Sequence, residues 1–139
     1  MKLLLLLVSV AFAANTPAGP GPSGLDEDPW QFEGESITAQ FGFRLDTAGD
    51  VNGDGFSDAL IASRKYSGGE SQEGRIYVFY GSDEGLPPSP SWTWEPDIAL
   101  SHCGGGVSSA GDVNGDGFGD IGVGCPEFDG GKGRVHLFF

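Results

Sequence analysis

The chain has 139 residues, in which 20 Asp and Glu outnumber seven Lys and Arg and give a formal net charge of −13 at pH 7. This acidity argues against a nucleic-acid partner, because such binding relies on Lys and Arg to neutralise phosphates. The length allows for one small domain.

The first residues follow the layout of a secretory signal peptide. Lys2 precedes a predominantly apolar run from Leu3 to Phe12, and the small residues Ala11 and Ala13 predict cleavage after Ala13. The run is shorter than the roughly 20 apolar residues of a membrane-spanning helix, although a retained membrane anchor is the alternative. We expect a signal peptide over residues 1–13, no membrane span after its cleavage, and a protein that is secreted and extracellular or at the cell surface.

Residues 14–28 are rich in Pro, Gly and Ser and end in acidic residues. Such a segment buries too little apolar surface to offset the entropy lost on ordering. We therefore expect a flexible leader, with the folded part beginning near Pro29.

Short strands are expected in chain order from there. The runs FRLDTA (43–48), DALIAS (58–63), RIYVFY (75–80) and SWTWEP (91–96) are bounded by Gly, Pro, Asp or Ser, as short antiparallel strands are. No stretch after residue 28 keeps a helical period over 11 residues. The fold class predicted is all-β.

The chain also repeats itself. Residues 48–58 read AGDVNGDGFSD and residues 110–120 read AGDVNGDGFGD, an offset of 62 positions that also maps Trp30 to Trp92 and Phe32 to Trp94. EGRIYVFYG (73–81) matches KGRVHLFF (132–139) after a three-residue deletion. We expect one repeat over residues 29–90 and a second, incomplete at its C-terminus, over 91–139, each giving a four-stranded antiparallel blade of a β-propeller.

The repeated string has the spacing of a calcium loop. Oxygen donors at positions 1, 3 and 5, a Gly at position 6 and a backbone carbonyl at position 7 are how such a loop surrounds its ion, and Ca²⁺ accepts six to eight oxygens in flexible geometry. A hairpin turn alone would explain the Asn-Gly and Asp-Gly pairs, but not three acids at odd positions twice. We expect two Ca²⁺ sites, with Asp50, Asn52, Asp54, Asp58 and the Phe56 carbonyl in the first, and Asp112, Asn114, Asp116, Asp120 and the Phe118 carbonyl in the second.

A helix-loop-helix calcium hand is excluded by position 12 of each loop. That motif needs a bidentate Glu there, and this chain has Ile61 and Val123. Each ion is therefore expected in a β-hairpin that Asp58 or Asp120 closes at position 9.

Taken together, the units resemble FG-GAP repeats, the blades of the integrin α-subunit propeller and of secreted bacterial repeat proteins. Phe41-Gly42 matches the FG element, Gly124-Cys125-Pro126 is close to GAP, and residues 62–64 have diverged from it. The resemblance implies a seven-bladed propeller, of which about two blades are present, with calcium on the face opposite the ligand surface. It implies a non-catalytic module for extracellular binding or adhesion, with an extracellular protein or glycan as the ligand.

The resemblance also bears on the two cysteines. Cys103 takes the Phe position of FG and Cys125 the Ala position of GAP, and in this fold those motifs lie near each other. In an exported chain the two cysteines then imply a disulfide, which would close a loop of about 22 residues; two free buried thiols are the alternative.

Other functional interpretations stay open. Trp92 and Trp94 either face a sugar or pack between blades, and Trp30 and Phe32 at equivalent places favour packing. No Ser, His and Asp stand at a spacing that suggests catalysis, so we expect no enzyme. The alternatives are a non-catalytic propeller fragment of a larger secreted hydrolase or lyase, and a carbohydrate-binding oligomeric propeller.

Two blades leave sheet edges open, and open edges invite pairing with other chains. An outer strand around Trp30, four strands from Phe41 to Glu95 and three beyond would make two whole blades if the first strand joined the last three. We expect either a fragment of a longer repeat protein or a subunit that assembles a ring from several copies.

Overall fold

The computed structural model describes residues 29–139, so the expected signal peptide (1–13) and leader (14–28) lie outside the described residues. Residues Phe32–Phe139 form one compact unit, which contains every described strand. Within residues 29–139, no helix is long and apolar enough to cross a membrane.

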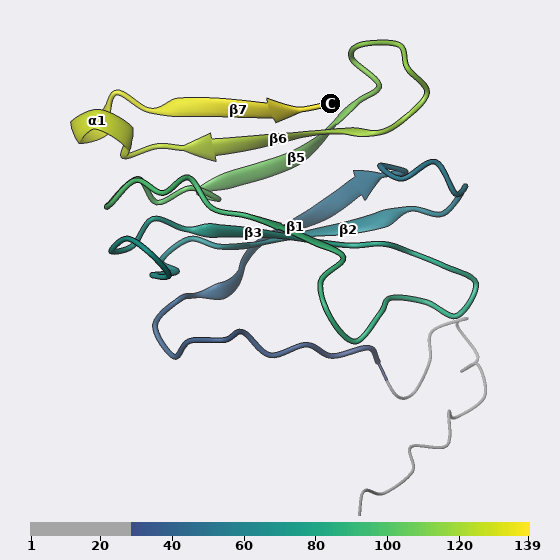
Figure 1. Ribbon diagram of the computed structural model, residues 1–139, viewed down its shortest axis with the longest axis horizontal. Helices are drawn as coiled ribbons and strands as arrows, with labels where there is room; N and C mark the ends of the chain where they lie inside the picture. The colour runs from purple at the N-terminus through teal and green to yellow at the C-terminus, as the bar shows by residue number, and fades with distance from the viewer. Residues whose placement is uncertain (1–28) are drawn as a thin grey trace, which may run out of the picture. The chain divides into compact units, whose positions relative to one another are not determined.

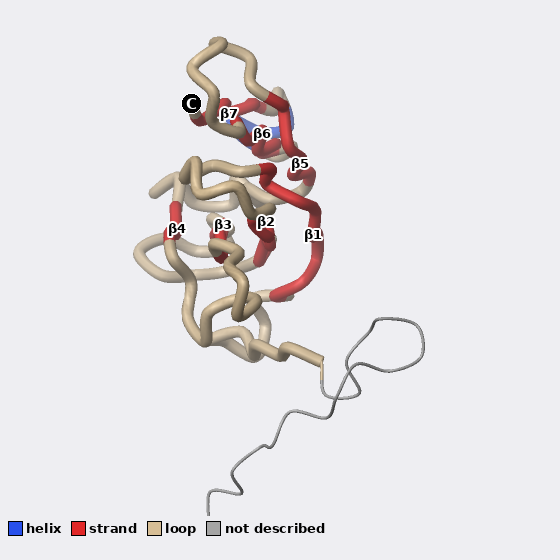
Figure 2. The backbone as a smooth tube through the Cα atoms, turned by 90° about the vertical axis from the view of Figure 1, so that its right-hand side faces the viewer, coloured by secondary structure: helices blue, strands red, loops and turns tan. Residues whose placement is uncertain are grey.

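The first sheet has four antiparallel strands that lie side by side in chain order (Figures 1 and 2). These are β1 (Phe41–Gly49), β2 (Asp58–Ser63), β3 (Arg75–Phe79) and β4 (Trp92–Trp94). All four expected strands are confirmed, and β4 adds to the edge of this sheet although the repeat pattern assigns its residues to the second unit. The sheets are therefore out of phase with the sequence repeats by one strand.

The second sheet has three antiparallel strands, β5 (Gly106–Gly111), β6 (Asp120–Cys125) and β7 (Arg134–Phe138). A single turn, α1 (Phe128–Gly131), joins β6 to β7, and Asp129 and Gly130 inside it have positive φ. The expectation of an all-β fold built from antiparallel blades is confirmed.

One hydrophobic core lies between the two sheets. β2 and β3 contribute Leu60, Ala62, Ile76 and Val78 on one face, and β6 contributes Ile121 and Val123 from the other side. Side chains alternate between the faces of a strand, so the next residues of β2 and β3, namely Ile61, Tyr77 and Phe79, form a second cluster on the opposite face. Burial on both faces explains why DALIAS is a continuous apolar run.

Aromatic residues pack in the same way in both repeats. The Phe32 ring lies 5.1 Å from the Phe79 ring. Trp94, the counterpart of Phe32, has its ring 5.1 Å from that of Phe138, the counterpart of Phe79 in the second sheet. Trp92 also packs on Phe138, at 5.3 Å. Both tryptophans therefore fill the space between the sheets, and the packing interpretation is confirmed.

The outer strand expected around Trp30 is wrong. Residues 29–40 form no strand, and among the described residues β7 has no neighbour on its outer edge. A strand needs a partner whose backbone groups are free. Phe32 instead packs its ring on Phe41 and Phe79, so it lies against a face of the first sheet and not along an edge.

Candidate functional site

Both acidic loops lie at one end of the sheets, the first between β1 and β2 and the second between β5 and β6, while α1 lies at the opposite end (Figure 1). Each loop turns through glycines at positions 4 and 6. In the first loop Gly53 and Gly55 have φ of 77° and 90°, and in the second Gly115 and Gly117 have 76° and 92°. A side chain is strained in this left-handed region, so glycine is needed there.

The carboxylate of Asp50 organises the first loop. It accepts hydrogen bonds from the backbone N–H groups of Gly53 at 2.7 Å, Asp54 at 3.0 Å and Gly55 at 2.9 Å. Asp54 in turn accepts from the Phe56 N–H at 2.9 Å and from Asn52 Nδ2 at 2.8 Å. Because the N–H groups of the loop point to its own side-chain oxygens, those oxygens are gathered on its inner side.

The second loop repeats this arrangement bond for bond. Seven hydrogen bonds of the first loop recur between the corresponding atoms of the second, with donor–acceptor distances that agree within 0.2 Å. Nearly identical sequence thus gives the same local hydrogen bonds on two different sheets. These seven bonds join residues within each loop.

The acid at position 9 closes the base of each loop. Asp58 is 2% exposed and accepts from the Val51 N–H at 2.8 Å and the Gly81 N–H at 2.8 Å. Asp120 is fully buried and accepts from Val113 at 2.6 Å, and its other oxygen, Oδ1, has no hydrogen-bond partner among the described residues. The position that corresponds to Gly81 would follow Phe139 in the repeat.

A calcium ion takes six to eight oxygen ligands. Each loop brings two carboxylates, one amide and one backbone carbonyl together, all hard oxygen donors of the kind that Ca²⁺ takes. Among residues 29–139, no three carboxylates have an oxygen each within 4.8 Å of one another. In the first loop the Asp58 carboxylate accepts from the backbone N–H groups of Val51 and Gly81. The chemistry of positions 1, 3, 5 and 7 fits calcium, and position 9 as a direct ligand stays a prediction.

The expected disulfide between Cys103 and Cys125 is present, with the two Cα atoms 3.9 Å apart. It joins the chain just before β5 to the end of β6. The corresponding residues of the first sheet, Phe41 and Ser63, are paired across β1 and β2. Both cysteines are almost completely buried. The alternative of two free thiols is therefore wrong for this structure.

His136 lies beside the disulfide, on β7. Its Nε2 is buried and has no hydrogen-bond partner among the described residues. Burial lowers the pKa of this imidazole below its usual range, with a further contribution from Arg134. The His136 ring packs on Trp94 with ring centroids 4.7 Å apart, so it contributes to the packing between the sheets.

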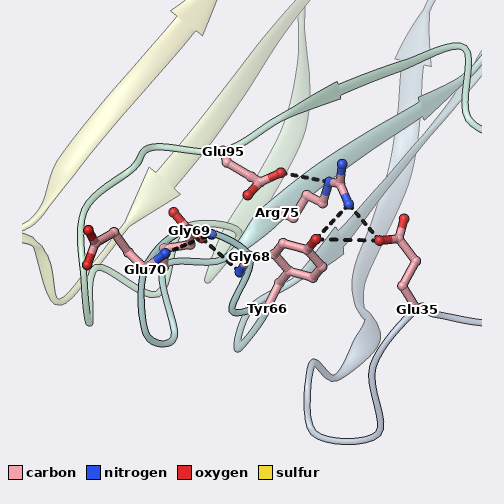
Figure 3. Close-up of polar contacts among 8 residues, drawn as sticks. Glu35, Tyr66, Gly68, Gly69, Glu70, Arg75 and Glu95 are labelled. Carbon is pink, nitrogen blue, oxygen red and sulfur yellow. Dashed lines mark hydrogen bonds and ion pairs between the residues drawn. The ribbon is translucent and has the colours of Figure 1, made fainter.

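A polar cluster that the sequence did not reveal lies at the opposite end of the first sheet (Figure 3). Arg75 contacts Glu35 at 2.7 Å, Glu95 at 3.0 Å and the Tyr66 hydroxyl at 2.9 Å. Burial raises the pKa of Glu95, although Arg75 acts to lower it. Nothing in the spacing of these residues predicts their meeting, since they come from four separate segments.

Glu73 holds the loop between β2 and β3 at this same end. Its Oε1 accepts from the backbone N–H groups of Gly68, Gly69 and Glu70, each at 3.0 Å, and the residue is fully buried. Hydrogen bonds to a carboxylate are stronger than those between neutral groups. Glu73 therefore ties the backbone of residues 68–70 to the segment that enters β3.

Side-chain contacts of His102 and Glu127 join the loops of both sheets. His102 contacts Glu127 at 2.8 Å through Nδ1 and Gln72 at 2.9 Å through Nε2, and Arg64 reaches Glu127 at 2.8 Å. The hydrogen bond with His102 and the nearby Arg64 hold the pKa of Glu127 below its usual value. The end opposite the acidic loops is thus a set of ordered loops joined by side-chain contacts.

Comparison with known proteins connects this geometry to a family. Residues 50–123, from the first loop through the second and into β6, match the model of the FG-GAP-like repeat. The chain belongs to the FG-GAP-like repeat family. The match begins with the first acidic loop and also includes the second, which ends shortly before residue 123.

The chain is also similar to curated proteins. It is 37% identical over 116 residues to integrin alpha-PS2 of Drosophila melanogaster, covering 76% of this chain and 8% of that protein. It is 32% identical over 106 residues to integrin alpha-IIb of Mus musculus, covering 76% and 10%. It is 32% identical over 109 residues to phosphatidylinositol-glycan-specific phospholipase D of Mus musculus, covering 67% and 12%. The chain thus spans about a tenth of the length of these relatives.

Proposed function

We propose that this chain is a secreted, non-catalytic FG-GAP module that binds calcium in its two acidic loops and mediates extracellular binding or adhesion. The observation that carries the proposal is the recurrence of one loop, with the same ligand set and the same hydrogen bonds, on both sheets. A turn does not require repeated carboxylates, whereas an ion between them does. The similarity to integrin alpha chains supports the adhesion part of the proposal.

Calcium would be held in the first loop by Asp50, Asn52, Asp54 and the Phe56 carbonyl, with Asp58 as the remaining carboxylate. The equivalent set of the second loop is Asp112, Asn114, Asp116, the Phe118 carbonyl and Asp120. The bound ion would neutralise the clustered acids, which otherwise repel one another. Extracellular calcium modules bind with dissociation constants of about 10⁻⁴ to 10⁻³ M, so calcium outside the cell would fill both sites.

We place ligand recognition at the end of the sheets opposite the acidic loops. The loops there are fixed by the Arg75 cluster, by the Glu73 carboxylate and by the bridge through His102 and Glu127. Ordered loops lose little entropy when a ligand binds. Exposed side chains on them, such as Ile37 and Leu100, are available for contact.

Isothermal titration calorimetry of the full mature chain with CaCl₂ tests the calcium proposal. We expect two sites, with Asp54→Ala removing one and Asp116→Ala removing the other. Asp83→Ala is the matched control, because Asp83 is an exposed acid in a turn outside both loops. Absence of binding heat at millimolar calcium to protein that circular dichroism shows to be folded would overturn the proposal.

A second candidate is a non-catalytic propeller segment of a larger secreted hydrolase. The similarity to a phospholipase D over 67% of the chain favours it. Expression of the longest reading frame that contains this chain, followed by assay of its lipase and glycan-cleaving activity with and without residues 29–139, separates the two. Activity in the longer product would favour the hydrolase, and its absence would favour the binding module.

A further inference from the structure

The repeated string differs at one position, Ser57 in the first loop and Gly119 in the second, and the structure explains the difference. Gly119 lies against the first loop, where its N–H donates to the backbone carbonyl of Asp50 at 2.6 Å. Ser57 is exposed, and its backbone carbonyl lies against Gly81, just after β3. Gly119 therefore belongs to the contact between the two loops.

The contact is tight for a side chain at position 119. A Cβ there would lie 3.0 Å from the Ala48 carbonyl oxygen and 3.0 Å from the Asp50 nitrogen. Both neighbours are backbone atoms of the first loop and of the strand that leads into it, so they cannot turn aside. Glycine at position 119 allows the two loops to approach this closely, and a side chain there would push their backbones apart by a few tenths of an ångström.

A second contact runs through the adjacent residue. The Phe118 ring lies over Gly53, so closely that a Cβ on Gly53 would be 2.5 Å from its Cε1 atom. Gly53 is position 4 of the first loop and donates to the Asp50 carboxylate. Gly119 thus contacts Asp50, the first residue of the first loop, and Phe118 contacts Gly53, where that loop turns.

We infer that residues 118–119 couple the two ion sites, so that calcium bound in either loop raises the affinity of the other. The inference rests on the calcium binding proposed above. An ion in the first loop would fix Asp50 and Gly53, and these are the surfaces on which Phe118 and Gly119 pack. The Phe118 carbonyl is itself a proposed ligand of the second ion, so the second loop is held ready to bind.

The contact between the loops is not symmetric in the described residues. Gly115, the counterpart of Gly53 in the second loop, has no atom within 4 Å of the position of a Cβ. The second loop therefore supports the first, and no described residue supports the second in the same way. Coupling must be reciprocal in affinity even so, because each site changes the other by the same factor.

A double-mutant cycle followed by calorimetry tests the inference. The four proteins are the wild type, Asp54→Ala, Gly119→Ser and the double variant, each titrated with CaCl₂. Loss of the first site should weaken calcium binding at the second by about 5-fold or more, the lower end of typical coupling. In the Gly119→Ser background, loss of the first site should change calcium affinity at the second site by less than about 2-fold, which is below the range of typical coupling. The cycle cancels the direct charge effect of Asp54, which is present in both backgrounds.

Ser57→Gly is the matched control, because it makes the first loop identical to the second and leaves the contact between them intact. It should behave as the wild type. Asp116→Ala should weaken the first site by the same factor by which Asp54→Ala weakens the second. If Gly119→Ser does not fold, Phe118→Leu removes the ring from Gly53 and retains the backbone carbonyl, and the cycle is repeated with it.

The outcomes separate the coupling from calcium binding itself. Two sites that are insensitive to each other in the wild type would overturn the coupling and leave the proposed function standing. Equal effects of Asp54→Ala with and without Gly119→Ser would overturn the role of residues 118–119. An absence of binding in every folded protein would overturn the proposed function.

Discussion

The two sheets carry the same pattern but are buried to different degrees. Ile76 and Val78 of β3 are 0% and 2% exposed, while Val135 and Leu137, the residues at the same places in β7, are 70% and 49% exposed. The first pair packs against the second sheet, and no described element covers the second pair. Equivalent residues therefore share a strand position without sharing a contribution to stability.

The two sheets also secure the same corner by different means. In the first, the Phe41 ring packs on Tyr77 at 5.1 Å, at the point where Phe41 pairs with Ser63. In the second, the disulfide between Cys103 and Cys125 occupies that place. A covalent bond replaces aromatic packing in the sheet that has fewer strands.

The largest expected effect comes from truncating β3 and β7 at their equivalent positions. Ile76→Ala should lower the free energy of unfolding by about 2–5 kcal/mol, because it leaves a cavity between the sheets. Val135→Ala should change it by less than about 0.5 kcal/mol, since that side chain is exposed. Urea denaturation in excess calcium measures both, and a comparable loss for Val135→Ala would mean that a partner covers this face in solution.

Removal of the disulfide should have the next largest effect. The double change Cys103→Ser with Cys125→Ser should lower stability by about 3 kcal/mol on a chain-entropy estimate for a loop of this length. Hydrogen exchange should show the loss in β6 and β7 first, while β2 and β3 keep their protection. Uniform loss across both sheets would contradict the idea that the bond serves the second sheet in particular.

Removal of calcium should affect the two loops to different degrees. Each site filled at ten times its dissociation constant would add about 1.4 kcal/mol to stability, and chelation would remove that contribution. In chelator we expect backbone amides of the second loop to exchange faster than those of the first, because Phe118 covers Gly53 and nothing described covers Gly115. Equal exchange in the two loops would argue against this asymmetry.

The smallest expected effects come from two acids with opposite pKa shifts. The pKa of Glu127 lies below its ordinary value of 4.5, so its contribution to stability is present above pH 4.5 and is lost as the pH falls through the folded-state pKa. The pKa of Glu95 lies above 4.5, so its contribution is present below that pH and is lost as the pH rises through the folded-state pKa. Thermal melts from pH 3 to 7 of Glu127→Gln and Glu95→Gln, in chelator, should therefore change the pH slope in opposite directions; slopes that change in the same direction would contradict the pair.

Much of the candidate site could be predicted from the sequence. The loops depend on glycines at two positions and on acids that bond to their own backbone, all within nine residues, so the string alone determines their shape. The strands follow from alternating or continuous apolar runs, and the disulfide from two cysteines placed in paired motifs. The strand expected around Trp30 failed because its formation depends on a partner edge that no local pattern records.

What the sequence determined by itself is therefore local: two acidic loops, seven short strands and one disulfide pair, each specified by residues close together in the chain or by direct repetition. Tertiary structure decided which face of each sheet is covered, that the Arg75 cluster forms from four segments, and that Gly119 lies against Asp50. These features join residues far apart in sequence, and their energies depend on packing between the sheets. The single difference between the two strings, Ser57 and Gly119, is visible in the sequence, but only the contact between the loops gives it a physical reason.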